Sequence, residues 1–278
     1  MIARVEARPA RRAGESRPAQ TARRVPVAIP VALGAAWALS IVAGRTGQAS
    51  LLNHGALIEG TPFRSPPPLW LALPLFLLAW QVMVVAMMLP SSLPMVRLFR
   101  VASARTDQHR ATMAAFLGGY LGVWGGFGAL AFAQDIGIHR LVDHTPWLAQ
   151  RPSLIGAAAL ALAGSFQFSA LKDRCLTECR HPAAYLLQHY RRGVGNGFRL
   201  GFGHGMFCLG CCWALMLLMF AAGVAQLWWM AALTALMVYE KVGRDGDRVT
   251  PFVGAALLAL AALLVIHPAW LPSVFSAR

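Results

Sequence analysis

The sequence predicts an all-α, polytopic membrane protein of about seven transmembrane helices. Three observations support this fold class: 57% of the 278 residues are hydrophobic, only 13% are charged, and long apolar runs recur along the chain. Soluble domains carry about a quarter of their residues as charged side chains. A run of roughly eighteen apolar residues can cross a bilayer as a helix, which satisfies its own backbone hydrogen bonds in lipid. Because the runs are continuous rather than alternating, they favour helices over barrel strands.

The expected organisation is a single transmembrane domain, residues 25–278, preceded by a basic arm. Residues 1–24 are rich in arginine, alanine and proline, so we expect this arm to be disordered and cytoplasmic. The sixth span is the shortest, and the brief connection Ala222–Val224 before it predicts an antiparallel helical hairpin. The expected spans are residues 25–44, 69–89, 112–134, 154–171, 200–222, 225–240 and 250–267.

The positions of the 25 lysine and arginine residues predict the orientation of these spans. Most of them lie in the N-terminal arm and in the segments after the second, fourth and sixth spans. Because cytoplasmic loops carry an excess of basic residues, we expect a cytoplasmic N-terminus and an external C-terminus. The net charge of +14 is spread over these loops rather than along one face. The expected partner is therefore the lipid bilayer and not a nucleic acid.

The fifth span is the most informative segment, because soft metal ligands recur in it at helical spacing. It contains Cys208, Cys211 and Cys212. His204 lies one turn before the first cysteine and Met216 one turn after the last, so all five side chains share one broad helical face. With the expected orientation, the thiols lie in the half of the membrane nearer the cytoplasm.

A second pair of thiols and a group of methionines lie toward the same side of the membrane. Cys175 and Cys179 are one helical turn apart, just beyond the expected cytoplasmic end of the fourth span. Met83, Met87 and Met88 lie near the end of the second span. Thiolates and thioethers select Cu(I) over hard cations, and cysteine with histidine also suits zinc. We therefore expect copper as Cu(I), with zinc as the alternative, although cysteine and methionine are also ordinary core residues.

Glycines recur at four-residue spacing in the third and fifth spans. Small residues at this spacing let two helices approach closely. We expect both stripes to pack against helices, and an oligomer could use the same faces. The stripes consist of Gly118, Gly122 and Gly126, and of Gly197, Gly201 and Gly205.

Several functional classes lack their signature in this sequence. No glycine-rich loop ends in Lys-Ser or Lys-Thr, so the sequence shows no evident nucleotide-binding site that could drive transport. No carboxylate lies near the middle of a span, which disfavours a proton relay built from aspartate or glutamate. The last span has no lysine for a retinal Schiff base. We expect a binding protein rather than an enzyme.

Several motifs together carry a resemblance to a known family. They are Ala86–Ser91, Leu171–Arg180 with its two cysteines, the block Gly203–Met216, and Glu240–Lys241. This set resembles the bacterial predicted metal-binding integral membrane proteins, a domain of unknown function. Ser169–Ala170 departs from the family's pattern, which often has threonine and proline there. The resemblance implies a multi-pass protein of the bacterial inner membrane that binds metal, and it supplies no reaction.

Three functions fit these residues. In the first, Cys175 and Cys179 receive Cu(I) at the cytoplasmic surface and pass it to the thiols of the fifth span, with a metal donor or a cuproenzyme as partner. In the second, the protein is a membrane thiol oxidoreductase, because Cys208 and Cys211 have the spacing of a redox dithiol. In the third, it is a structural or assembly subunit in which the cysteines only pack.

Overall fold

The computed structural model describes residues 27–45, 57, 65, 67–222 and 227–267. The predicted arm, most of the connection between the fifth and sixth spans, and residues 268–278 lie outside the described residues. Every regular element in the described part is a helix, which confirms the all-α prediction. The long helices are α2 (Ala28–Arg45), α4 (Leu69–Ser103), α5 (His109–Asp143), α10 (Val194–Ala222), α11 (Leu227–Val242) and α12 (Gly246–Ile266). The shorter ones are α6 (Pro146–Ala149), α7 (Pro152–Phe166), α8 (Ala170–Arg180) and α9 (Pro182–His189).

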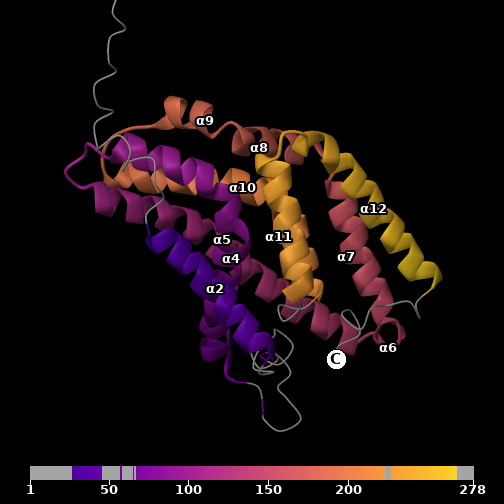
Figure 1. Cartoon of the computed structure of the whole chain (residues 1–278). Coiled ribbons are helices and arrows are strands. Elements are labelled where there is room, and N and C mark those ends of the chain that lie inside the picture. The colour runs from indigo at the N-terminus through magenta and orange to yellow at the C-terminus, as the bar shows by residue number, and fades with distance from the viewer. Residues whose placement is uncertain (1–26, 46–56, 58–64, 66, 223–226, 268–278) are drawn as a thin grey trace, which may run out of the picture.

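The helices pack into one elongated bundle (Figure 1). Helix α10 packs along α5, which in turn contacts α4, and α7 packs along α12. Helices α8 and α9 lie across one end of the bundle, where α8 contacts both α10 and α11. The buried side chains of α4, α5, α8, α10 and α11 form one continuous hydrophobic cluster, which contains all five cysteines.

Five of the described helices are long and apolar enough to cross a membrane: α2, α4, α5, α10 and α12. Helices α7 and α8 pass the same test together, with a bend of 64° between them, so the number rises to six if they form one broken span. Helix α11 has only 16 residues, fewer than the roughly twenty that a span requires. The bundle is compatible with a multi-pass membrane protein, and the count of seven spans stays a prediction.

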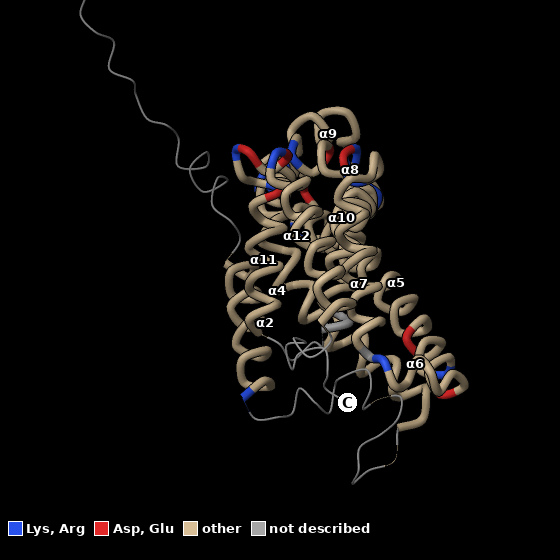
Figure 2. The backbone as a smooth tube through the Cα atoms, turned by 90° about the vertical axis from the view of Figure 1, so that its right-hand side faces the viewer, with Lys and Arg blue, Asp and Glu red and all other residues tan. Residues whose placement is uncertain are grey.

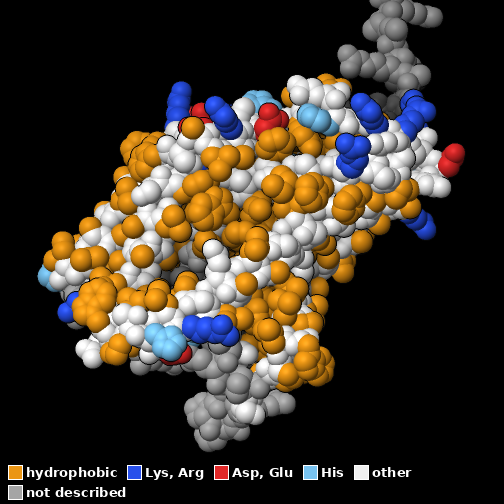
Figure 3. Space-filling view, turned by 180° about the vertical axis from the view of Figure 1, so that it is seen from behind, with side chains coloured by type: hydrophobic (Ala, Val, Ile, Leu, Met, Phe, Trp, Pro, Cys, Tyr) orange, Lys and Arg blue, Asp and Glu red, His pale blue; other side chains and the backbone are white. Residues whose placement is uncertain are grey.

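The surface of the bundle separates apolar from charged residues. Lysine, arginine, aspartate and glutamate gather mainly at the end that carries α8 and α9 (Figure 2). The face seen in Figure 3 is covered by hydrophobic side chains between a basic upper edge and a few charges below. Large apolar side chains are strongly exposed on several helices, among them Leu78 at 67%, Leu130 at 65% and Phe252 at 75%. A water-soluble monomer rarely exposes so much apolar surface, whereas lipid would cover it.

A proline in α4 is accommodated by a side chain from α2. Pro90 has no backbone N–H, so the carbonyl of Ala86, four residues earlier, lacks its helical donor. The indole Nε1 of Trp37 donates to this carbonyl over 3.1 Å. The contact joins α2 to the bundle and satisfies a polar group that lipid could not.

The two glycine stripes behave differently. An added Cβ at Gly201 on α10 would overlap the backbone of Phe116 on α5, so this stripe brings the two helices into close contact as expected. The stripe on α5 was predicted wrongly, because an added Cβ at its members meets no atom within 4 Å. The close contact on α5 is made instead by Gly119, one position along from the stripe. The members that face open space are Gly118, Gly122 and Gly126.

The predicted fourth span, residues 154–171, is interrupted in the structure. Helix α7 ends at Phe166, and α8 begins at Ala170. Ser169 forms the N-cap of α8, where its hydroxyl accepts a hydrogen bond of 3.1 Å from the backbone N–H of Lys172. The resulting bend turns α8 away from the axis of α7 and against α10, which places its cysteines beside those of α10.

Candidate metal centre

Helix α10 supplies three thiols that are almost fully buried. Cys208 is 0% exposed, and Cys211 and Cys212 are each 1% exposed. The thiols of Cys211 and Cys212 both donate to the backbone carbonyl of Cys208, over 3.2 Å and 2.7 Å. Because these residues lie three and four positions after Cys208, the helical repeat itself places the sulfurs together.

Helix α8 brings the second cysteine pair to the same place. The Sγ atom of Cys179 lies 3.9 Å from that of Cys211. Cys175 approaches α10 where Gly210 leaves room, because an added Cβ at Gly210 would overlap the Cys175 sulfur. Both α8 thiols are only 8% exposed. They therefore lie inside the bundle, whereas the sequence suggested a position at the surface beyond the fourth span.

Helix α4 adds a thioether to these thiols. The thiol of Cys212 donates to Sδ of Met88 over 3.6 Å. Met87 and Met88 are each 0% exposed. We call these five residues the sulfur-rich region: Met88, Cys179, Cys208, Cys211 and Cys212.

A lysine from α11 lies within the sulfur-rich region. The ammonium group of Lys241 donates to the Sγ atoms of Cys208 and Cys212 over 3.1 Å and 3.5 Å, and to Oγ of Ser91 over 3.2 Å. Lys241 is 6% exposed. Its positive charge therefore sits against sulfur atoms inside the protein rather than in water.

A buried ion pair lies next to this lysine. Nζ of Lys172 and Oε2 of Glu240 are 2.8 Å apart, and their side chains are 0% and 2% exposed. The second carboxylate oxygen of Glu240, Oε1, is buried and makes no hydrogen bond. Arg180 donates to the backbone carbonyl of Glu240 over 2.7 Å, which fixes the end of α11 against α8.

Two aromatic side chains complete the site on the side of α5. The hydroxyl of Tyr120 lies 3.2 Å from the Cys208 sulfur and accepts a hydrogen bond of 3.0 Å from Ser92. The ring of His204 stacks on that of Tyr120, with centroids 5.8 Å apart and an interplanar angle of 24°. The Nε2 atom of His204 is buried and has no hydrogen-bond partner.

The structure thus gathers most of the residues that the sequence singled out. Cys175, Met87 and Met216 belong to the same hydrophobic cluster as the sulfur-rich region, and Met216 is 0% exposed. The sequence reasoning missed the charged residues, because Lys172 and Lys241 were assigned to loops. One signal could have found them: the chain has only two lysines against 23 arginines. Both lysines are buried at this site.

A metal ion sets the spacing of the sulfur atoms that bind it. Two sulfurs that bind one ion at about 2.3 Å each lie about 3.8 Å apart at a tetrahedral angle and about 4.6 Å apart in a linear arrangement. The separations of 3.9 Å between Cys179 and Cys211 and of 3.6 Å between Cys212 and Met88 are close to the lower value. Within the described part of the chain, no group of three or more His, Cys, Asp or Glu side chains is arranged to hold a metal ion. The hydrogen bonds to the Cys208 carbonyl direct the thiols of Cys211 and Cys212 at the backbone.

Comparison with known families identifies the group to which the chain belongs. The family model described as PpoB2, copper chaperone, matches residues 77–264. The chain belongs to the PpoB2 family. No curated protein and no solved structure matches it. The PpoB2 match runs from within α4 to within α12, so it includes every helix that contributes to the sulfur-rich region. A family described as a copper chaperone agrees with the metal-related resemblance of the sequence and associates the chain with copper.

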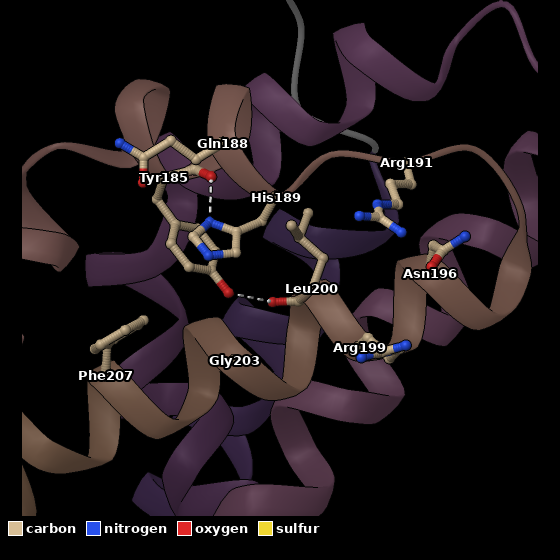
Figure 4. Close-up of a pocket in the computed structure, with 9 residues that line it drawn as sticks. All are labelled: Tyr185, Gln188, His189, Arg191, Asn196, Arg199, Leu200, Gly203 and Phe207. Atoms are coloured by element: carbon tan, nitrogen blue, oxygen red, sulfur yellow. Dashed lines mark hydrogen bonds between the residues drawn. The ribbon is translucent and has the colours of Figure 1, made fainter.

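A cavity of about 400 Å³ lies apart from the sulfur-rich region, between α9, the segment after it and the start of α10 (Figure 4). Arg191 and Arg199 line one part of it, and Tyr185 lines another. The Tyr185 hydroxyl donates to the carbonyl of Leu200 over 3.4 Å. Burial, with a smaller effect from nearby acidic groups, raises the pKa of Tyr185 to about 12, so its hydroxyl is neutral at physiological pH. No cysteine lines this cavity.

Proposed function

We propose that this protein is a membrane-embedded copper chaperone that binds Cu(I) in the sulfur-rich region and passes it to a cuproprotein. The observation that carries the proposal is the convergence of buried sulfurs from α4, α8 and α10, in which two separate pairs, Cys179 with Cys211 and Cys212 with Met88, each have a spacing that suits two ligands of an ion. Soft thiolates and thioethers select Cu(I), and membership of the PpoB2 family supports copper as the cargo. Zinc is the second candidate, because thiolates with an imidazole also suit it.

Metal would be held by exchangeable sulfur ligands. Cys208, Cys211 and Cys212 form the core of the ligand set, with Cys179 the nearest thiol from α8. Met88 supplies a thioether, and the remaining candidates are Cys175, Met87, Met216 and His204. Because the ligands come from three helices, a shift of α8 against α10 would change the number of sulfurs around the ion. Such exchange moves a monovalent soft ion between sites without a nucleotide.

The same proposal includes the membrane setting. The apolar surface, the long helices and the charged end of the bundle support a multi-pass membrane protein, and from the family resemblance we propose the bacterial inner membrane as its location. We propose seven spans in one domain, residues 25–278, with the N-terminus in the cytoplasm. The open glycine face of α5 offers a surface to lipid or to a second copy of the chain. A reporter fused after Arg278 tests the orientation, and a cytoplasmic signal contradicts it.

Elemental analysis of detergent-purified protein tests the metal site. We expect copper in the wild-type protein after reconstitution with Cu(I) under reducing conditions, and a large loss in the Cys208→Ser, Cys211→Ser double variant. Met206→Leu is the matched control, because Met206 lies on the same helix but is 47% exposed. If the wild type and the double variant bind equally little copper, the proposal is wrong.

One observation favours a second candidate, a membrane thiol oxidoreductase. The Sγ atoms of Cys179 and Cys211, which lie on different helices, are 3.9 Å apart. A redox function predicts a reversible disulfide between α8 and α10. Mass spectrometry after treatment with a quinone or a thiol couple separates the two functions, because a copper chaperone requires these thiols reduced.

A further inference from the structure

We propose that Lys241 makes the sulfur-rich region selective for a monovalent soft cation over a divalent one. This inference rests on the proposed metal site and adds the residue that sets its charge preference. The ammonium group of Lys241 touches two of the proposed sulfur ligands, at 3.1 Å and 3.5 Å. No proposed ligand is a carboxylate, so this cation is a fixed part of the site's charge.

The neighbouring charges do not cancel that of Lys241. The nearby carboxylate of Glu240 is bound to Lys172 at 2.8 Å, and the two form a neutral pair. The third partner of the Lys241 ammonium is the hydroxyl of Ser91, which carries no charge. The negative charge that faces Lys241 must therefore come from the thiolates.

The sum of charges then depends on the metal. The thiolates of Cys208 and Cys212, which Lys241 contacts, one Cu(I) ion and the Lys241 ammonium add up to zero, with the thiols of Cys179 and Cys211 protonated and neutral. A divalent ion such as Zn(II) on the same ligands leaves one positive charge buried, close to the ammonium group. An uncompensated charge inside a protein is strongly unfavourable, and like charges at such distances repel. A lysine in this position therefore favours the monovalent ion.

The position of Lys241 is rigid enough to act in this way. It lies at the end of α11. The residue before it, Glu240, is held through its side chain by Lys172 and through its backbone carbonyl by Arg180. Lysine carries a compact point charge, which here lies against the sulfurs of Cys208 and Cys212. A chain that otherwise uses arginine almost throughout has lysine at this point.

Competition between Ag(I) and Cd(II) tests the proposal, because both are soft ions and they differ in charge. Detergent-purified wild type, Lys241→Met and Lys241→Gln are equilibrated with both ions, and the bound ions are counted by elemental analysis. We expect the bound ratio of Ag(I) to Cd(II) to fall at least tenfold in both neutral variants. Arg244→Met is the matched control: Arg244 is an exposed cation three positions further on, so its removal leaves the ratio unchanged.

The outcomes separate a failure of the Lys241 inference from a failure of the metal site itself. If the folded neutral variants bind metal with the wild-type ratio, Lys241 does not set the preference, although the metal site stands. If wild type binds neither ion, both the metal site and this inference are wrong. Lys241→Arg keeps the positive charge, so it tests the inference even where a neutral variant does not fold. We expect its bound ratio of Ag(I) to Cd(II) to stay near that of wild type. A tenfold fall in this ratio contradicts the inference.

Discussion

The buried pair Lys172 and Glu240 allows a direct test of how charges are held beside the sulfur-rich region. The substitution Glu240→Gln removes the negative charge and leaves the Lys172 ammonium, which is 0% exposed, without its partner at 2.8 Å. At an effective dielectric constant near 20, two unit charges at this distance attract by about 6 kcal/mol. Breaking a buried pair by removing one partner typically costs about 3–5 kcal/mol. Since a whole domain is stable by only about 5–15 kcal/mol, we expect a large loss.

Equilibrium unfolding in detergent, followed by circular dichroism, measures this effect. The matched control is Asp245→Asn, which removes a carboxylate whose partner, Arg248, lies 3.3 Å away at the surface. An exposed pair contributes about 0–1 kcal/mol, so the control should unfold almost like wild type. The double variant Lys172→Met, Glu240→Leu removes both charges and should be more stable than Glu240→Gln alone, because no buried charge is left unpaired. If Glu240→Gln costs no more than Asp245→Asn, the pair does not hold this part of the bundle together.

Three further substitutions test packing and ligands. Gly201→Ala should lower the stability of the bundle by several kcal/mol, because its Cβ overlaps the α5 backbone. The control Gly122→Ala, whose Cβ meets open space, should leave unfolding in detergent nearly unchanged. Met88→Leu keeps the buried volume but removes the thioether, so the copper affinity should fall by about tenfold in a competition titration. The control Met206→Leu should keep the wild-type copper affinity. Equal affinities in the two variants would remove Met88 from the ligand set. Trp37→Phe should cost about 1–3 kcal/mol in the same unfolding assay, because a carbonyl in α4 loses its donor, and an unchanged midpoint contradicts this account.

The apolar runs predicted the helices well, but not where they end. The second span was expected to end at residue 89, whereas α4 continues through Pro90 and Pro94 to Ser103. Hydropathy reports only the part of a helix that suits lipid, so a helix that continues into polar sequence is cut short. Pro90 interrupts the helical hydrogen bonds, yet a partner on α2 satisfies the carbonyl that the proline leaves free. Such tertiary compensation cannot be read from one segment.

The cysteines were predicted together because helical spacing is a local property. Cys208, Cys211 and Cys212 share a face of α10 whatever surrounds them. The approach of Cys179 depends on the 64° bend after α7, which is a property of two elements and not of either sequence alone. The role of Lys241 was missed for a related reason: a lysine at the end of a span looks like a residue at the membrane surface. Only the packing of α11 against α4 and α10 places it inside.

Burial of all five thiols means that metal must reach them through a movement of the bundle. Helix α8 is short and lies at the charged end of the bundle, and its movement would require the Lys172–Glu240 ion pair to separate. A break of a few residues also separates it from α7. Cys175 and Cys179 are 8% exposed on this helix, against 0% for Cys208 in the long helix α10. Local opening of α8 should therefore expose its own thiols before those of α10.

The order of thiol alkylation tests this route. With a water-soluble maleimide on protein in detergent, we expect Cys175 and Cys179 to react before Cys208 and Cys212, and peptide mass spectrometry identifies the labelled sites. Leu187→Cys, at a position that is 85% exposed, supplies the rate of a fully accessible thiol within the same chain. Prior loading with Ag(I) should slow all the native thiols and leave the introduced one unaffected, because only the former would be metal ligands. Reaction of Cys212 ahead of the α8 pair would mean that the site opens from within the bundle and not at α8.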